Sequence, residues 1–281
     1  MGADGVKSSQ NGTRRVASSV AMTILNVKQP QMFTEQDRDR VYEEVLTWAR
    51  SDPRFVSAAV VGSLATRPGD RWSDLDLTFG ISDEASIPEV LNTWSERLAQ
   101  TFDAAALFDL PSGGAIYRVF LLRGCLQVDL SFAPASQFGA IGPDFRLLFG
   151  SAVSKPHVGP PSARDLFGYA VHHAVRARIC IERGRLWQAE YWISGLRDNA
   201  MSLACRRRGL PAYYGRGFDE LPAELRSHAE GALVRALETE TLAKALQCGV
   251  ELLLTESGEA GDLPSNVEAR LREFTTRQAP T

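Results

Sequence analysis

The chain has 281 residues, of which 44% are hydrophobic, and this length and composition suit two folded domains of ordinary size. Its formal net charge of -3 argues against a protein that grips duplex nucleic acid, because such proteins carry a basic surface that neutralises phosphates. The four cysteines are scattered without a Cys-x-x-Cys pair, which excludes the usual signatures of a zinc site or a disulfide framework.

The N-terminal part of the chain changes character near residue 34. Residues 1–33 are rich in small polar residues without periodicity, and we expect a disordered tail there. Thr34 is a plausible helix N-cap with Asp37 three residues on, and apolar residues recur on one face from Val41 to Trp48. A helix is therefore predicted from residue 34 to Asp52-Pro53, packed on a sheet.

A short β-rich run from Val56 to Val61 ends at Gly62-Ser63, where a residue without Cβ permits the close approach of a backbone or a ligand. In the next predicted strand, Asp74 and Asp76 alternate with apolar residues, so both carboxylates share one face. Two like charges side by side are unfavourable unless they are protonated, solvated or bound to a cation such as Mg²⁺. A metal site is the interpretation we favour, and a solvated pair beside a plain turn is the alternative.

The loop between these strands, residues 64–73, contains Arg67 and Arg71, either of which could contact a phosphate or simply be solvated. A helix is predicted from after Ser86 to about Phe102, and a hairpin over 115–122 and 125–132. In the second hairpin strand Asp129 has the parity to face the same side as Asp74 and Asp76. Three converging carboxylates can hold two metal ions on a triphosphate.

These residues form one motif, which consists of Gly62-Ser63, ten intervening residues, Asp74-Leu75-Asp76-Leu77 and the later Asp129. Over roughly residues 50–135, the motif resembles that of the DNA polymerase β-like nucleotidyltransferase superfamily. The resemblance implies an α+β fold whose catalytic domain is a mixed β-sheet with flanking helices. It also implies that Gly62 and Ser63 receive the β- and γ-phosphates of ATP, and that the three aspartates bind two Mg²⁺ ions.

The second half of the sequence is helical. Residues 133–163 are interpreted as a transition segment, and helices are predicted over 164–183, 186–208, 222–236, 239–255 and 265–277. In the second helix, Glu190, Ser194 and Arg197 form a polar strip beside an apolar stripe. Our hypothesis is that Glu190 is the general base and that Ser194 and Arg197 contact the nucleotide. A solvated helix face is the alternative.

This order of domains is similar to that of the small-molecule antibiotic nucleotidyltransferases, the aminoglycoside and lincosamide enzymes. The resemblance implies a catalytic domain over residues 34–160, a helical bundle over 161–281 that binds the acceptor, and transfer of AMP from ATP to an acceptor hydroxyl. Two alternatives stay open: an enzyme that modifies a protein or an RNA, and a catalytically silent nucleotide-binding module.

The expected setting follows from what the sequence lacks. No apolar run reaches the roughly 20 residues of a membrane helix, and no signal-peptide core is present, so we expect a cytoplasmic protein. We expect a small-molecule acceptor as its partner, with no membrane and no stable nucleic acid, and the sequence is compatible with a homodimer.

Overall fold

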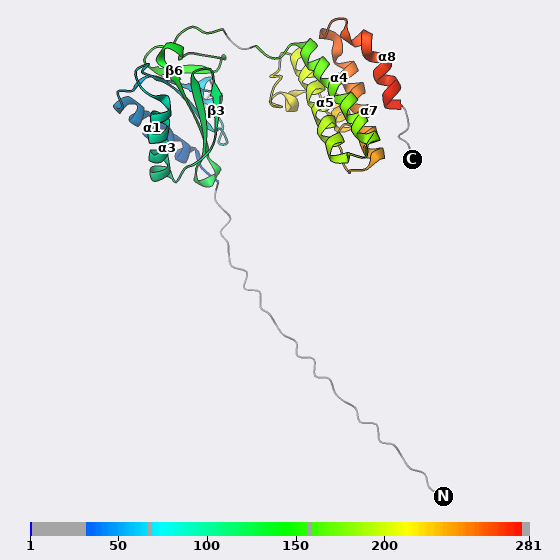
Figure 1. The fold of residues 1–281 in the computed structure, drawn as a ribbon, viewed down its shortest axis with the longest axis horizontal. Coiled ribbons are helices and arrows are strands. Elements are labelled where there is room, and N and C mark those ends of the chain that lie inside the picture. Colours follow the sequence, from blue (N-terminus) through cyan, green and yellow to red (C-terminus); the bar gives the residue numbers. More distant parts are fainter. Residues whose placement is uncertain (2–31, 67–68, 157–158, 277–281) are drawn as a thin grey trace. The chain divides into compact units, whose positions relative to one another are not determined.

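The computed structural model describes Met1 and residues 32–66, 69–156 and 159–276 (Figure 1). It has the expected α+β fold, in which a mixed six-stranded sheet with flanking helices is followed by C-terminal helices. The chain divides into two compact units, Met1–Pro156 and His157–Thr281. The predicted disordered tail, residues 1–33, lies outside the described residues except for Met1 and residues 32–33.

The first unit holds the sheet, with strand order β3-β4-β5-β2-β1-β6. Only β2 and β5 run parallel, and the other neighbours are antiparallel. The elements of this unit are β1 (Phe55–Val61), β2 (Leu75–Ile81), β3 (Ala105–Ser112), β4 (Ala115–Leu121), β5 (Gln127–Pro134), β6 (Phe145–Phe149), α1 (Glu35–Ser51), α2 (Ser63–Thr66), α3 (Ile87–Phe102), and the 3₁₀ turns η1 (Arg123–Cys125) and η2 (Ala135–Gln137).

Helices α1 and α3 pack on one face of the sheet (Figure 1). The predicted cap is present: the Thr34 hydroxyl accepts from the Asp37 amide, and the Asp37 carboxylate accepts from the Thr34 amide. The aromatic ring of Trp94 on α3 stacks on Phe55 at 4.3 Å between centroids and lies 5.3 Å from Phe79. This core leaves the polar residues of β2 and β5 on the opposite face.

Two strands were not predicted from the sequence. Strand β3 is exposed along its whole length and contains Pro111, so it shows neither the alternation nor the apolar run that marks a half-buried strand. Strand β6 falls in the segment 133–163 that was interpreted as a transition, and at five residues it is too short for a reliable pattern. Both lie at the edges of the sheet, where pairing with a neighbour defines the strand.

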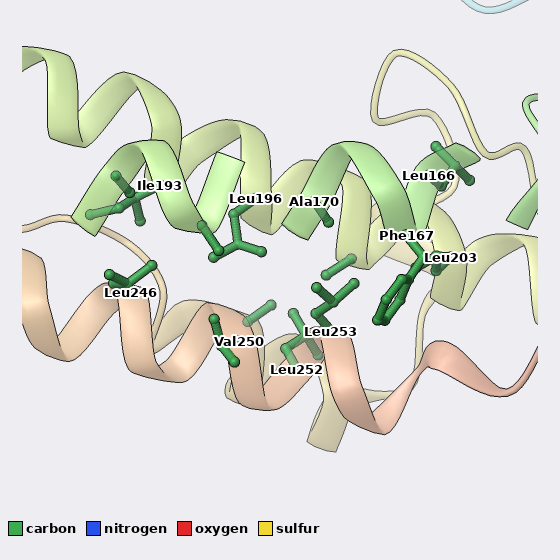
Figure 2. Packing of buried hydrophobic residues seen from close by; sticks show 14 of the residues in the cluster. Leu166, Phe167, Ala170, Ile193, Leu196, Leu203, Leu246, Val250, Leu252 and Leu253 are labelled. Atoms are coloured by element: carbon green, nitrogen blue, oxygen red, sulfur yellow. The ribbon is translucent and has the colours of Figure 1, made fainter. Parts of the chain in front are cut away.

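The second unit is built on α4 and α5, which pack together and against α7. Figure 2 shows Phe167 of α4, Leu196 of α5 and Val250 of α7 among the side chains that fill its core. Its elements are α4 (Ala163–Glu182), α5 (Leu186–Arg207), α6 (Ala223–Glu230), α7 (Thr239–Thr255), α8 (Leu263–Thr276), η3 (Phe218–Glu220) and η4 (Ser257–Glu259).

Four of the five helices predicted in this unit agree with the structure within two residues at each end. The fifth, predicted over 222–236, is wrong at its C-terminal end, because α6 stops at Glu230 before Gly231. Glycine loses more backbone freedom in a helix than other residues do, which favours termination there. None of the helices in the described part of the chain combines the length and the apolar character that a membrane-spanning segment requires.

Candidate metal centre

The parallel pairing of β2 and β5 brings the aspartates together. Asp76 and Asp129 are direct partners in the ladder, so their side chains leave the same face of the sheet. Asp74 precedes β2 by one residue and keeps the same parity. One carboxylate oxygen from each of the three residues lies within 4.8 Å of the other two. The three carboxylates share one face, as the two-residue period of a strand predicts, whereas their role as metal ligands stays a prediction.

Gly62 lies directly against this cluster. Its φ of +68° is in the left-handed region, which glycine adopts without strain. A Cβ atom built on Gly62 would lie 2.5 Å from Asp76 Oδ2, closer than carbon and oxygen can approach. The turn after β1 therefore needs glycine for two reasons, its backbone conformation and the space that Asp76 occupies. Ser63, the other predicted phosphate-binding residue, follows it and is exposed.

The two carboxylate oxygens of Asp129 have different surroundings. Oδ2 accepts a hydrogen bond from the Tyr117 hydroxyl at 2.6 Å and another from Gln127 Nε2 at 3.1 Å. Oδ1 is buried and has no hydrogen-bond partner among the described residues. A buried acceptor without a partner costs stability, and a bound cation would relieve that cost. The residues therefore fit a hard divalent cation, for which carboxylate oxygens are the preferred ligands.

The pKa values of the clustered side chains also favour a bound cation. Burial, followed by the negative charges of Asp74 and Asp129, raises the pKa of Asp76 from its ordinary value of 3.8 to about 7. Burial also raises the pKa of Asp129. Burial and the bond to Asp129 raise the pKa of Tyr117, so its hydroxyl stays protonated and donates. Below about pH 7 and without a cation, the cluster therefore holds a proton that a metal ion must displace.

We expect metal affinity to depend on pH because of this proton. Asp76 has a raised pKa in the folded protein, so below about pH 7 a divalent cation competes with one proton. The affinity for Mn²⁺ should then rise by about tenfold per pH unit from pH 5 to pH 7 and level off above that. Calorimetric titration with Mn²⁺ across this range is the measurement. An affinity independent of pH would contradict the protonated state of Asp76.

The same raised pKa affects stability without metal. In the unfolded chain Asp76 ionises near its ordinary value of 3.8, so the unfolded state binds fewer protons than the folded state between about pH 4 and pH 7. This group therefore lowers the stability of the metal-free protein as the pH rises through that window. Added Mg²⁺ should consequently raise the melting temperature more at pH 8 than at pH 5.

Arg38 of α1 supports the loop that leads into Asp74. It is 5% exposed, and its Nη1 donates to the carbonyl oxygens of Asp70 at 2.7 Å and Ser73 at 3.3 Å. Backbone carbonyls at fixed positions are good partners for the rigid guanidinium group. Arg38 thus ties the segment immediately before the aspartate cluster to the helical layer on the covered face of the sheet.

The glycine turn is held from the other side by β6 and the segment before it. The amide of Gly62 donates to the carbonyl of Asp144 at 3.2 Å, and Arg146 Nε donates to the carbonyl of Ala65 at 3.3 Å. Of the two loop arginines, Arg67 lies outside the described residues. Arg71 is exposed and lies over the ring of Trp72 at 4.1 Å from the centroid.

The remaining predicted site residues lie on α5 in the second unit. The Ser194 hydroxyl donates to Glu190 Oε1 at 2.8 Å, so these two residues interact as their i, i+4 spacing predicts. Arg197 forms an ion pair with the neighbouring Asp198 at 2.9 Å. Glu190 and Ser194 are half-buried. Their functional roles stay predictions.

Sequence reasoning missed Tyr117 and Gln127, although a signal was present. Gln127 precedes Asp129 by two residues on one strand, and so shares its face. In the β4–β5 hairpin, Val119 lies opposite Asp129, which places Tyr117 on the same face. Arg38 gave no such signal, because its contact with the loop joins segments over 30 residues apart.

No protein-family model and no curated protein matches the chain. Among solved structures, it is similar to an aminoglycoside 6-adenyltransferase from Bacillus subtilis, with 12% sequence identity and a TM-score of 0.37, over 88% of this chain and 100% of that chain. A likeness at this TM-score supports no inference about fold or chemistry.

Proposed function

We propose that this protein is a Mg²⁺-dependent nucleotidyltransferase that moves AMP from ATP to a hydroxyl of a small molecule and releases pyrophosphate. The acceptor class that best suits the sequence resemblance is an aminoglycoside- or lincosamide-like antibiotic. The observation that carries the proposal is the convergence of Asp74, Asp76 and Asp129 beside the turn at Gly62.

The energetic cost of this arrangement favours a cation-binding cluster over a solvated pair of aspartates beside a plain turn. Asp129 is 6% exposed and retains an oxygen without a partner among the described residues, and Asp76 is held next to two other carboxylates. Buried like charges destabilise a fold unless something compensates them. A site for divalent cations explains why three acids occupy adjoining positions in the sheet.

Different groups of residues have different roles in the proposed reaction. Asp74, Asp76 and Asp129 would hold the metal ions, which when bound neutralise phosphate charge and acidify an attacking hydroxyl. Gly62 and Ser63 would bind the β- and γ-phosphates, and Arg67, Ser194 and Arg197 would add polar contacts to the nucleotide. The acceptor oxygen bonds to the α-phosphorus, the bond to the β-phosphate oxygen breaks, and the hydroxyl proton passes to a base. Positioning and charge neutralisation supply most of the acceleration.

The test is release of pyrophosphate from ATP in the presence of Mg²⁺ and a panel of hydroxylated acceptors, including aminoglycosides and lincosamides. We expect release that depends on one acceptor class and stops with EDTA, and a product heavier than the acceptor by one AMP moiety. Transfer of label from α-labelled ATP to protein or RNA instead would favour a macromolecular acceptor. Metal and nucleotide binding without transfer would overturn the enzymatic proposal.

Glu190→Gln tests the proposed general base. The change keeps the shape of the side chain and its bond with Ser194 but removes the proton acceptor. We expect kcat to fall by about 10²-fold or more, with little change in ATP binding. The matched control is Glu251→Gln on α7, another half-buried glutamate paired at i, i+4, here with Gln247. Equal turnover in the two variants would remove Glu190 from the mechanism.

A further inference from the structure

Asp129 presents two unequal oxygens to the metal centre. Two donors converge on Oδ2, the Tyr117 hydroxyl at 2.6 Å and the Gln127 amide at 3.1 Å. Oδ1 is buried and unpartnered among the described residues. An isolated aspartate can turn about its Cβ–Cγ bond and exchange its oxygens. Here the two donors hold one oxygen in place, so the other is the one left for a ligand.

Tyr117 also reaches a second member of the cluster. Its hydroxyl lies 3.4 Å from Asp76 Oδ1, and Asp76 is the ladder partner of Asp129 on the neighbouring strand. A phenol has one proton, and the shorter distance assigns it to Asp129. The hydroxyl oxygen therefore lies within reach of two carboxylates that repel each other. It comes from β4, on the other side of β5 from Asp76.

We propose that Tyr117 is a positioning residue of the metal centre: with Gln127, it fixes the Asp129 carboxylate so that Oδ1 is the metal ligand before any cation binds. The inference rests on the proposed function, since it assumes that the three aspartates bind metal. Residues that hydrogen-bond to a metal ligand orient it and thereby strengthen binding. Without the hydroxyl, Asp129 can rotate, and that freedom must be lost again when the cation binds.

The test is Tyr117→Phe in the full-length protein, measured by calorimetric titration with Mn²⁺. We expect the Mn²⁺ affinity to fall by about 10- to 100-fold. Activity, where transfer is detected, should recover at high Mg²⁺ concentration, because the ligands themselves are intact. Tyr42→Phe is the matched control: Tyr42 is another half-buried tyrosine of the same unit, where it packs against the core and lies outside the aspartate cluster. It should bind Mn²⁺ as the wild type does.

The outcomes separate this inference from the proposed function. If the wild type binds Mn²⁺ and Tyr117→Phe binds it equally well or more tightly, the positioning role is overturned and the metal centre stands. If the wild type binds no Mn²⁺, both the positioning role of Tyr117 and the proposed function are overturned. Should Tyr117→Phe melt far below the wild type, Gln127→Leu decides the matter, because it removes the other donor to Asp129 Oδ2 and should also weaken binding. Unchanged affinity in Gln127→Leu would then overturn the inference.

Discussion

Asp76→Asn should nearly abolish transfer while making the metal-free protein more stable. The amide is close to isosteric with the carboxylate but binds Mg²⁺ poorly, so we expect activity to fall by about 10³-fold or more. Replacing a buried charge next to Asp74 and Asp129 also removes repulsion, so the melting temperature without metal at pH 8 should rise. Pyrophosphate release and thermal unfolding are the two measurements.

The opposite directions of these two effects distinguish a catalytic loss from a folding defect. Glu96→Gln serves as the control, since Glu96 is an exposed acid on α3, the helix on the covered face of the sheet. It should leave both transfer and stability unchanged. An Asp76→Asn protein with wild-type activity would contradict the two-metal role. An inactive but less stable variant would mean that Asp76 acts mainly in folding.

Gly62→Ala should disrupt the site through two additive effects. Alanine at a φ of +68° costs roughly 1–2 kcal/mol of folding free energy. In addition, the new methyl group would lie 2.5 Å from Asp76 Oδ2, so the carboxylate must turn away from its present position. We expect Mn²⁺ affinity to fall by at least about tenfold and transfer to fall with it. Calorimetric titration and denaturant unfolding measure the two effects.

Gly113 provides a control for backbone strain alone. Its φ is +59°, and a Cβ built there has no atom within 4 Å. Gly113→Ala should therefore lose roughly 1–2 kcal/mol of stability and keep the wild-type metal affinity. If both variants keep that affinity, the contact between Gly62 and Asp76 is not needed for metal binding.

Local patterns were enough for most elements and for the shared face of the three aspartates. The alternation of Asp74 and Asp76 with buried leucines, and the same parity at Asp129, follow from the two-residue period of a strand. The cap at Thr34 and the helices of the second half follow from equally local rules. These features are readable because each depends on residues close together in the sequence.

Strands β3 and β6 were not readable, because both lie at sheet edges and take their conformation from one neighbour. The environment of Asp129 was readable only in part, because strand parity places Tyr117 and Gln127 on its face but does not show which atoms they contact. Tyr117 and Gln127 hold Oδ2 of Asp129, while its Oδ1 is buried without a described partner. This arrangement depends on the hairpin register and on side-chain rotamers. The sequence by itself determined which acids could share a face. Only the tertiary structure decided that β2 and β5 are adjacent, because strand order depends on contacts between residues far apart in the chain.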